Sequence, residues 1–419
     1  MCTNILGDEL PFAIIGQVLI ILAATIILGE VFEQFELPAV AGALLAGLIL
    51  GPTLLSLIQP SPQLSAIESI SLFFIMFFIG LEMKTELITK NISKALLLSG
   101  TSFILPLVFV SSLTYGLLGF SPIESFAMSL AITVPSISII SVLVRRYKLL
   151  DKATGYLILS SVILTDIIAF ILLILISRPF TSAEATLIET GILILIFLVA
   201  EKVARNYAKG FNKAMRRIKP FLKSSNIAYG IILIFGFFFA AVFNYIGITY
   251  IIGAFFAGLI VHSIIYGRSA YGRVTRTFGR ITDGFFIPLF FGIAGASALL
   301  DYADISFGIA AGIVVIISAA IISSYVLTHK LSDSVIPGSY ARKSRRAAGI
   351  LSGRGAVGVA IATIALDAGI ISSLSYSIII FATVVISIIA SVFLRGVGAG
   401  QRPDKELAMK DIEPVDEWE

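Results

Sequence analysis

Hydrophobic stretches long enough to cross a lipid bilayer follow one another along almost the whole chain. Each is near the roughly 20 residues that a helix needs to cross about 30 Å of hydrocarbon. About thirteen can be delimited, at approximately residues 12–32, 38–58, 66–83, 94–120, 123–145, 153–177, 186–203, 226–246, 248–267, 282–300, 305–327, 345–367 and 375–397. Only 13% of the 419 residues are charged, against roughly 25% in soluble domains. The sequence therefore predicts an all-α, polytopic membrane protein in which residues 1–397 form one transmembrane domain within the lipid bilayer.

Lysine and arginine are concentrated in alternate connections between these stretches. The connection at 204–225 is the longest and most basic, whereas the opposite set of connections contains almost only Arg178. Short loops rich in lysine and arginine stay in the cytoplasm. We therefore expect a multi-pass protein of the plasma membrane with its N-terminus outside and its C-terminus inside, and with residues 398–419 as a short cytoplasmic tail.

The connection at 204–225 also divides the stretches into two similar sets, which suggests a six-helix inverted repeat. The equivalent fifth and twelfth stretches both carry helix-disfavouring residues near their middles: Thr133 and Pro135 in one, Gly353, Arg354 and Gly355 in the other. Proline removes a backbone donor and glycine weakens a helix. Paired interruptions of this kind point to a binding site at mid-membrane, although proline and glycine also kink packed helices. Arg354 is interpreted as structural support at the interruption.

Asp166 lies near the middle of the stretch at 153–177, about 13 residues from one end and about 11 from the other, which is about 20 Å and about 17 Å at about 1.5 Å per residue. Placing an aspartate there costs at least about 2.5 to 3.5 kcal/mol, so such residues usually serve a function. Protons and a monovalent cation would compete for its carboxylate, and that competition is sufficient for exchange. A carboxylate that only holds helices together is the alternative interpretation.

Alkali cations need hard oxygen ligands, and hydroxyl groups surround these positions in the sequence. Asp166 and Thr133 are the primary candidates for the alkali-metal site, and Thr165, Ser161 and Ser136 are further candidates for ion and proton binding. Each hydroxyl has an ordinary alternative, because serine and threonine in membrane helices usually bond to the backbone or to neighbouring helices.

Several landmark stretches occur in a characteristic order, at residues 37–52, 77–82, 253–258, 287–291 and 353–358. Together they resemble the monovalent cation:proton antiporters, particularly the bacterial and archaeal sodium/proton exchanger branch. Asp166 matches the ion-binding aspartate of that family, and Thr133 matches the threonine at its fifth-helix break. The resemblance covers nearly the whole chain.

The resemblance implies a thirteen-helix fold with two crossed, broken helices and a homodimeric assembly. It further implies a core domain at about 66–177 and 282–397, which moves like an elevator against a dimerisation domain at about 12–58 and 186–267. Such a protein contributes to pH homeostasis. It transports Na⁺ and H⁺ as substrates, needs no cofactor, binds no nucleic acid and is not an enzyme.

Three departures from the family pattern bear on the stoichiometry. Thr165 replaces the first member of the usual acidic pair, Ala356 replaces an acid, and the stretch at 305–327 has no lysine or arginine. With one evident titrating group, the expected reaction is electroneutral exchange of one Na⁺, or Li⁺, for one H⁺. A K⁺/H⁺ antiporter, a sodium-coupled organic anion symporter and a passive channel are the alternatives, and Na⁺, Li⁺ and K⁺ all use similar oxygen ligands.

Overall fold

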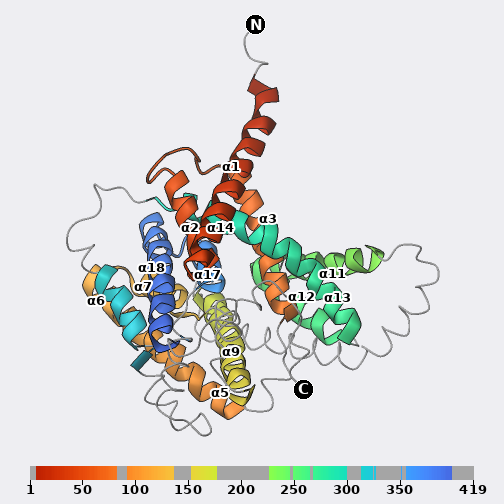
Figure 1. The fold of residues 1–419 in the computed structure, drawn as a ribbon. Helices are drawn as coiled ribbons and strands as arrows, with labels where there is room; N and C mark the ends of the chain where they lie inside the picture. The colour runs from red at the N-terminus through yellow and green to blue at the C-terminus, as the bar shows by residue number, and fades with distance from the viewer. Residues whose placement is uncertain are drawn as a thin grey trace. The chain divides into compact units, whose positions relative to one another are not determined.

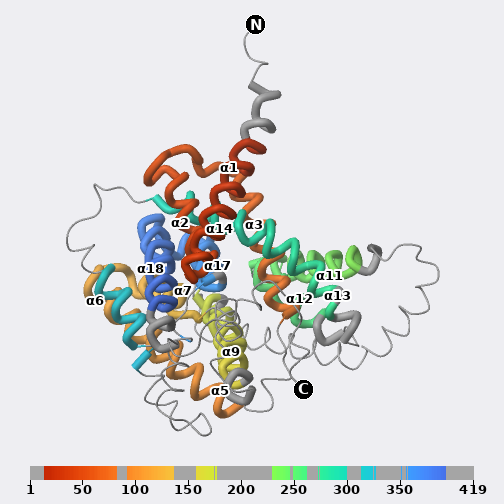
Figure 2. The backbone as a smooth tube through the Cα atoms, in the orientation of Figure 1, coloured from red at the N-terminus to blue at the C-terminus, as the bar shows by residue number. Residues whose placement is uncertain are grey.

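A computed structural model of the chain describes residues 6–82, 92–135, 152–176, 226–245, 249–264, 268–299, 313–323, 325–326, 351 and 355–398. All the secondary-structure elements in these ranges are helices (Figure 1), and Figure 2 follows the same backbone path. Four of the helices described here are long and apolar enough to cross a membrane. The all-α class is confirmed. The count of thirteen spans stays a prediction, because the stretch at 186–203 and much of 305–327 and 345–367 lie outside the described residues.

The elements in chain order are α1 (Leu6–Gln34), α2 (Ala39–Leu50), α3 (Pro62–Glu82), α5 (Ile92–Ser99), η1 (Gly100–Ile104), α6 (Leu105–Leu118), α7 (Pro122–Thr133), α9 (Lys152–Ile176), α11 (Asn226–Tyr245), α12 (Tyr250–Ile264), α13 (Arg268–Ile281), η3 (Thr282–Phe286), α14 (Ile287–Ala296), α17 (Ala356–Asp367) and α18 (Ser373–Gly398). Helices α3, α9, α11 and α18 lie within a few residues of the predicted stretches. Two elements differ from the prediction. Helix α2 ends early, at Leu50, and α13 forms a helix where a basic loop was expected.

Two π-helical turns, η1 and η3, interrupt long helices, and each ends two residues before a proline. In η1 the amide of Leu105 donates to the carbonyl of Gly100, and in η3 the amide of Ile287 donates to that of Thr282. Pro106 and Pro288 follow. A proline lacks the amide donor and clashes with the carbonyl one turn earlier, so a wider turn accommodates it without ending the helix.

The chain groups into two compact units, one containing residues 1–64, 85–177 and 291–419 and the other residues 65–84 and 178–290. Within the first unit α1 packs on α2, α5 on α9, α7 on α17, and α18 on both α2 and α7; within the second, α11 packs on α12. This grouping places α1 and α2 with α9, whereas the predicted domains placed 12–58 with 186–267. The predicted domains are defined by relative motion, and they stay a prediction.

Glycines of the landmark stretches lie where helices pack backbone against backbone. In the first unit, a Cβ on Gly51 would lie 2.7 Å from the carbonyl oxygen of Ala296, and one on Gly47 would clash with the carbonyl of Gly292. In the second unit, Gly80 of α3 faces the backbone of α12 in the same way. These glycines therefore allow close helix crossings that any larger residue would push apart.

Candidate cation-binding site

Asp166 is completely buried in α9, a helix of 25 residues. Neither oxygen of its carboxylate has a hydrogen-bond partner among the residues that the structure describes. A buried charge without a partner is strongly unfavourable. A carboxylate in this setting is therefore suited to hold a proton or a cation.

The face of α9 around Asp166 is apolar. Val162, Ala169 and Phe170 lie one turn before and one turn after it on the same face, and all three are fully buried. Helix α9 packs against α5, α7 and α17 within the first unit (Figure 1). Beyond the hydroxyls of α9 itself, oxygen ligands for an ion at Asp166 would therefore come from these neighbouring helices or from the backbone.

Thr165 and Ser161 belong to a small hydroxyl network between α9 and α5. The hydroxyl of Thr165 lies 2.8 Å from the carbonyl oxygen of Ser161 and 3.1 Å from the Oγ of Ser99. Ser99 donates to the same Ser161 carbonyl at 2.7 Å, and Ser161 itself donates to the carbonyl of Ile158 at 2.9 Å. Ser99 is a site residue that the sequence reasoning missed. Its position in the polar run 99–102 inside an apolar stretch is the signal that would have identified it.

Thr133 is the last residue of α7, and the helix ends at the predicted interruption. The next residue, Val134, is extended with φ −67° and ψ 121°, because a following proline disfavours helical geometry in the residue before it. The Thr133 hydroxyl donates to the carbonyl of Ser129 at 2.7 Å. The final turn of a helix also leaves carbonyl groups without partners at the negative end of its dipole, which favours a cation at this position.

The second interruption lies before α17, which begins at Ala356 after Gly355. Gly358 packs directly on the carbonyl oxygen of Ala131, so α7 and α17 cross where α7 ends and α17 begins. Ends of opposite dipole sign therefore lie close together at this crossing. Of the predicted site residues, Ser136, Gly353 and Arg354 lie outside the described residues.

The structure places the other predicted site residues on α9, at the end of α7, and directly before α17, where Gly355 is buried. Asp166, Thr165 and Ser161 are on α9 and are buried, and Thr133 and Pro135 are buried at the end of α7. Helices α7 and α9 are in contact. Thr165 and Ser161 are joined directly by a hydrogen bond.

A buried carboxylate with no hydrogen-bond partner among the described residues, on a helix that contacts both α7 and α17, is typical of membrane-embedded ion transporters. The family described as "Sodium/hydrogen exchanger, transmembrane" matches residues 18–398. The chain therefore belongs to the sodium/hydrogen exchanger family, as the landmark stretches predicted. This is a family of cation/proton antiporters and not of enzymes, and the ions it transports are its substrates.

Individual relatives agree with this assignment. The chain is 28% identical over 280 residues to the "Probable Na(+)/H(+) antiporter 3" of Methanocaldococcus jannaschii, covering 66% of this chain and 69% of that protein. It is 25% identical to the "Na(+)/H(+)-K(+) antiporter GerN" of Bacillus cereus, covering 92% and 96%. A 28% identical relative, the "K(+)/H(+) antiporter 1" of Saccharomyces cerevisiae, is matched over 81% of this chain but only 41% of its own length.

The fold also matches a solved structure. The sodium proton antiporter MjNhaP1 of Methanocaldococcus jannaschii at pH 8 superimposes with a TM-score of 0.68 at 17% identity, covering 94% of this chain and 98% of that one. At this identity the match concerns the fold alone. It confirms the predicted sodium/proton antiporter-like fold.

Proposed function

We propose that the chain exchanges Na⁺, with Li⁺ as an additional substrate, for H⁺ at Asp166, one cation for one proton. The observation that carries this proposal is the fully buried Asp166 carboxylate, which has no hydrogen-bond partner among the described residues. The family assignment supplies the class of reaction. Asp166 is the binding group that both ions share in turn.

The exchange follows from the charge of the buried site. With a proton bound, the Asp166 carboxyl is neutral, and with one Na⁺ bound the site is again close to neutral. The empty carboxylate is charged, and moving it through the membrane interior carries a large desolvation cost. The two loaded forms can therefore change access from one side to the other, whereas the empty form cannot.

The candidate ligands keep oxygen lone pairs for a cation. The hydroxyls of Thr133 and Ser161 donate their protons to helix carbonyls, and a hydroxyl oxygen that donates still carries two acceptor lone pairs. Thr165 and Ser136 are the further candidates, and the carbonyls at the end of α7 complete the set. In this proposal Pro135, Gly353, Arg354 and Gly355 are structural support at the helix crossing, where proline and glycine leave backbone groups free to meet the ion.

The one-for-one stoichiometry rests on the charge content of the membrane stretches. Asp166 is the only Asp, Glu, Lys or Arg in the stretch at 153–177, and 305–327 contains none. Replacing one proton by one Na⁺ on a single carboxylate moves no net charge. The exchange is therefore independent of membrane potential.

The proposal also includes the assembly, the membrane orientation and the motion of the protein. The protein is a homodimer of the plasma membrane, with its N-terminus outside and its C-terminus inside. The core at 66–177 and 282–397 carries Asp166 past the domain at 12–58 and 186–267 in an elevator motion. The basic connections of the sequence support the orientation.

Potassium is the second candidate cation. Two relatives are named for potassium, the yeast K(+)/H(+) antiporter 1 and the Bacillus cereus Na(+)/H(+)-K(+) antiporter GerN. The candidate ligands are hydroxyl and carboxylate oxygens, which suit either ion. Transport assays must therefore compare the cations directly.

The test is dissipation of a pH gradient in proteoliposomes on addition of Na⁺, Li⁺ or K⁺, with and without a clamped membrane potential. We expect Na⁺ to move protons equally well under both conditions and the Asp166→Asn variant to show no exchange. The apparent Michaelis constant for Na⁺ should rise as the pH falls, since protons occupy the same carboxylate. Voltage-driven exchange would overturn the stoichiometry, a response to K⁺ alone would change the substrate, and a fully active variant would remove Asp166 from the mechanism.

A further inference from the structure

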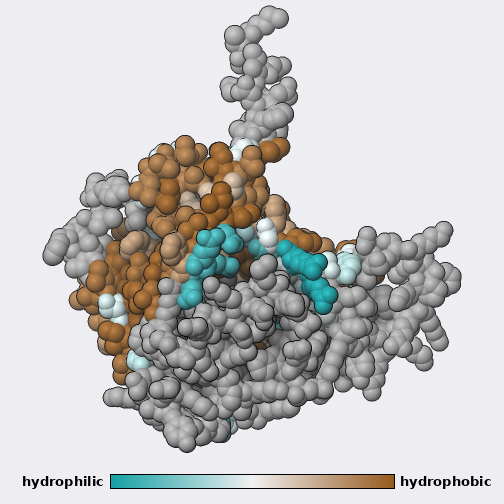
Figure 3. Space-filling view, in the orientation of Figure 1, coloured by the Kyte–Doolittle hydropathy of each residue, from teal (hydrophilic) through white to brown (hydrophobic). Residues whose placement is uncertain are grey.

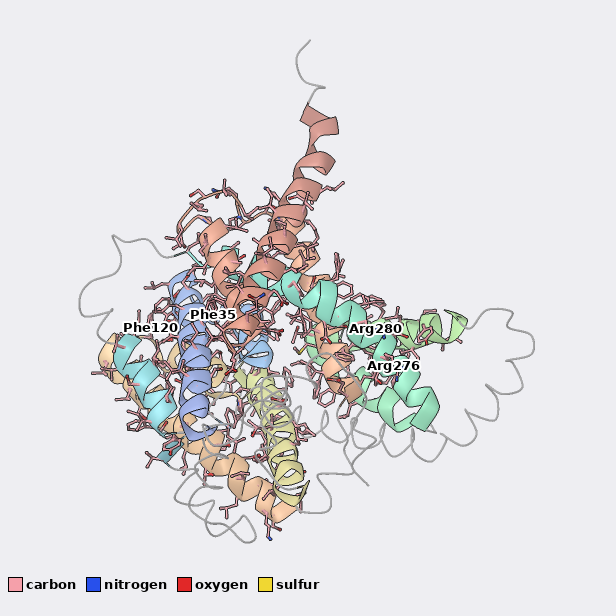
Figure 4. The ribbon with its side chains drawn as sticks, in the orientation of Figure 1. Phe35, Phe120, Arg276 and Arg280 are labelled. Atoms are coloured by element: carbon pink, nitrogen blue, oxygen red, sulfur yellow. The ribbon has the colours of Figure 1, made fainter. Side chains whose placement is uncertain are left out.

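Helix α13 presents a basic face that the exchange reaction does not use. Arg276 and Arg280 are four residues apart and therefore lie on the same side of the helix, where both side chains are exposed (Figure 4). Among the described residues, no hydrogen bond or ion pair engages either guanidinium group. Figure 3 shows the hydrophilic strip that α13 forms at the surface.

The opposite face of α13 fixes its rotation within the second unit. Val274 and Phe278 are buried, and the ring of Phe278 lies 5.9 Å from that of Phe77 and 6.1 Å from that of Tyr229. Between the two arginines, the hydroxyl of Thr277 donates to the Tyr229 hydroxyl at 3.3 Å. The arginines are therefore held on the outward side and do not belong to a freely rotating segment.

Exposed apolar side chains follow directly after Arg280, on the side of the helix next to the arginine face. Ile281 and Phe285 are 50% and 41% exposed, and α13 continues through η3 into the apolar helix α14. At about 1.5 Å per residue, Arg280 and Arg276 precede Ile281 by about 1.5 and 7.5 Å along the axis. These axial distances are similar to the thickness of the polar headgroup layer, which is roughly 5 to 7 Å on each side of the hydrocarbon.

We propose that α13 binds the headgroup of an anionic phospholipid, with its phosphate on Arg276 and Arg280 and its acyl chains along Ile281 and Phe285. Guanidinium groups bind phosphate oxygens with paired hydrogen bonds, and basic residues beside a membrane segment attract anionic lipids. The exposed apolar side chains of Ile281 and Phe285 beside the arginine face favour a lipid over free phosphate. Asp283 is also exposed on this face, and it forms no ion pair with either arginine among the described contacts.

The test is thermal unfolding of the purified protein in an uncharged detergent, with increasing amounts of short-chain phosphatidylglycerol, short-chain phosphatidylcholine or inorganic phosphate. We expect phosphatidylglycerol alone to raise the melting temperature of the wild type. The double variant Arg276→Gln/Arg280→Gln should bind it at least about tenfold more weakly, since each basic residue contributes about 1 kcal/mol to binding an anionic surface. The double lysine variant should lie between the two.

Lys94→Gln is the matched control, because Lys94 is an exposed cation at the start of α5 and its loss should leave the phosphatidylglycerol response unchanged. Equal stabilisation of the wild type and the double glutamine variant would overturn the proposal, and so would equal stabilisation by phosphatidylcholine or by inorganic phosphate. The double lysine variant keeps the test informative if the glutamine variant does not fold. The readout is unfolding, so its outcome is independent of whether the chain exchanges Na⁺ for H⁺.

Discussion

Asp166 on α9 and Glu124 on α7 carry the same chemical group within the same compact unit, but their carboxylates have opposite environments. Asp166 is fully buried, and no hydrogen bond reaches either oxygen from the described residues. Glu124 is half-buried, and its Oε1 accepts from the amide of Ser372 at 2.9 Å and from the hydroxyl of Ser375 at 2.6 Å. Both donors lie at the beginning of α18.

The difference separates a carboxylate that holds structure from one that can bind an ion. Ser121 caps α7 by accepting from the amide of Glu124 at 3.2 Å, which is half of a capping box. The carboxylate of Glu124 turns instead to the neighbouring helix, where free amides and the helix dipole favour negative charge. Glu124 therefore ties the start of α7 to the start of α18, whereas Asp166 keeps its oxygens available.

The largest effect expected from this comparison is on transport. Asp166→Asn should reduce Na⁺/H⁺ exchange at least about 100-fold, because the lost charge removes about 2.8 kcal/mol or more of cation binding. Glu124→Gln should retain exchange, since the amide oxygen can still accept from Ser372 and Ser375. Proteoliposome exchange rates for the two variants, at equal amounts of folded protein, provide the measurement. If the glutamine variant is equally inactive, the distinction between the two carboxylates is wrong.

For the free energy of unfolding, we expect substitution of Glu124 to have a larger effect than substitution of Asp166. Glu124→Ala removes the acceptor for two donors and should lower the free energy of unfolding by about 1.5 to 3 kcal/mol, as expected for hydrogen bonds to a charged group. Asp166→Asn replaces a buried carboxylate, which has no hydrogen-bond partner among the described residues, with a neutral group and should not destabilise the fold. Thermal unfolding in detergent measures both variants, with Glu124→Gln as the conservative control. A larger loss for Asp166→Asn than for Glu124→Ala would indicate that Asp166 has a structural role.

Segment length and apolar composition were sufficient to predict the long helices. The spans that contain α3, α9, α11 and α18 could be delimited within a few residues because apolar length is the dominant signal in a membrane. The helix α13 was missed because its arginines indicated a cytoplasmic connection, and its buried face rests on widely spaced residues such as Val274 and Phe278. Helix α2 ends early, at Leu50, directly before Gly51. The close approach of Gly51 to Ala296 depends on tertiary packing, which the sequence pattern does not reveal.

Site residues could be predicted from the sequence where the feature that marks them lies within a single hydrophobic stretch. Asp166 stands out because it is a charge within an apolar stretch, and the end of α7 follows from Pro135. Ser99 and Glu124 were not singled out, because their partners lie far away in sequence, although the polar run 99–102 marks the position of Ser99. Ser99 is 66 residues from Thr165, and Glu124 is 248 residues from Ser372. Such pairs are set by helix packing, which a single sequence does not specify.

Two glycines of the first unit, Gly358 on α17 and Gly116 on α6, differ in how much space surrounds their backbone. Gly358→Ala would push α17 away from the carbonyl of Ala131 at the helix crossing, and overpacking of this kind costs about 1 to 3 kcal/mol. Gly116 on α6 has open space where a Cβ would lie, so Gly116→Ala should stabilise that helix by up to about 1 kcal/mol. Thermal unfolding of the two variants is the measurement. Equal tolerance at both positions would argue against a tight crossing of α7 and α17.

The smallest effect is expected at Ser99, which supports the Asp166 region without carrying a charge. Ser99→Ala removes the contact with Thr165 and the bond to the Ser161 carbonyl, which should cost about 1 kcal/mol of stability. The same change at Ser112, an exposed serine with one local bond to Val108, should cost almost nothing. Exchange by Ser99→Ala should persist with a modestly higher apparent Michaelis constant for Na⁺, because Thr165 and Ser161 keep their own backbone bonds. If Ser99→Ala instead abolishes exchange as Asp166→Asn does, the binding site extends onto α5, and the ion is held by two helices whose hydroxyls are as important as the carboxylate.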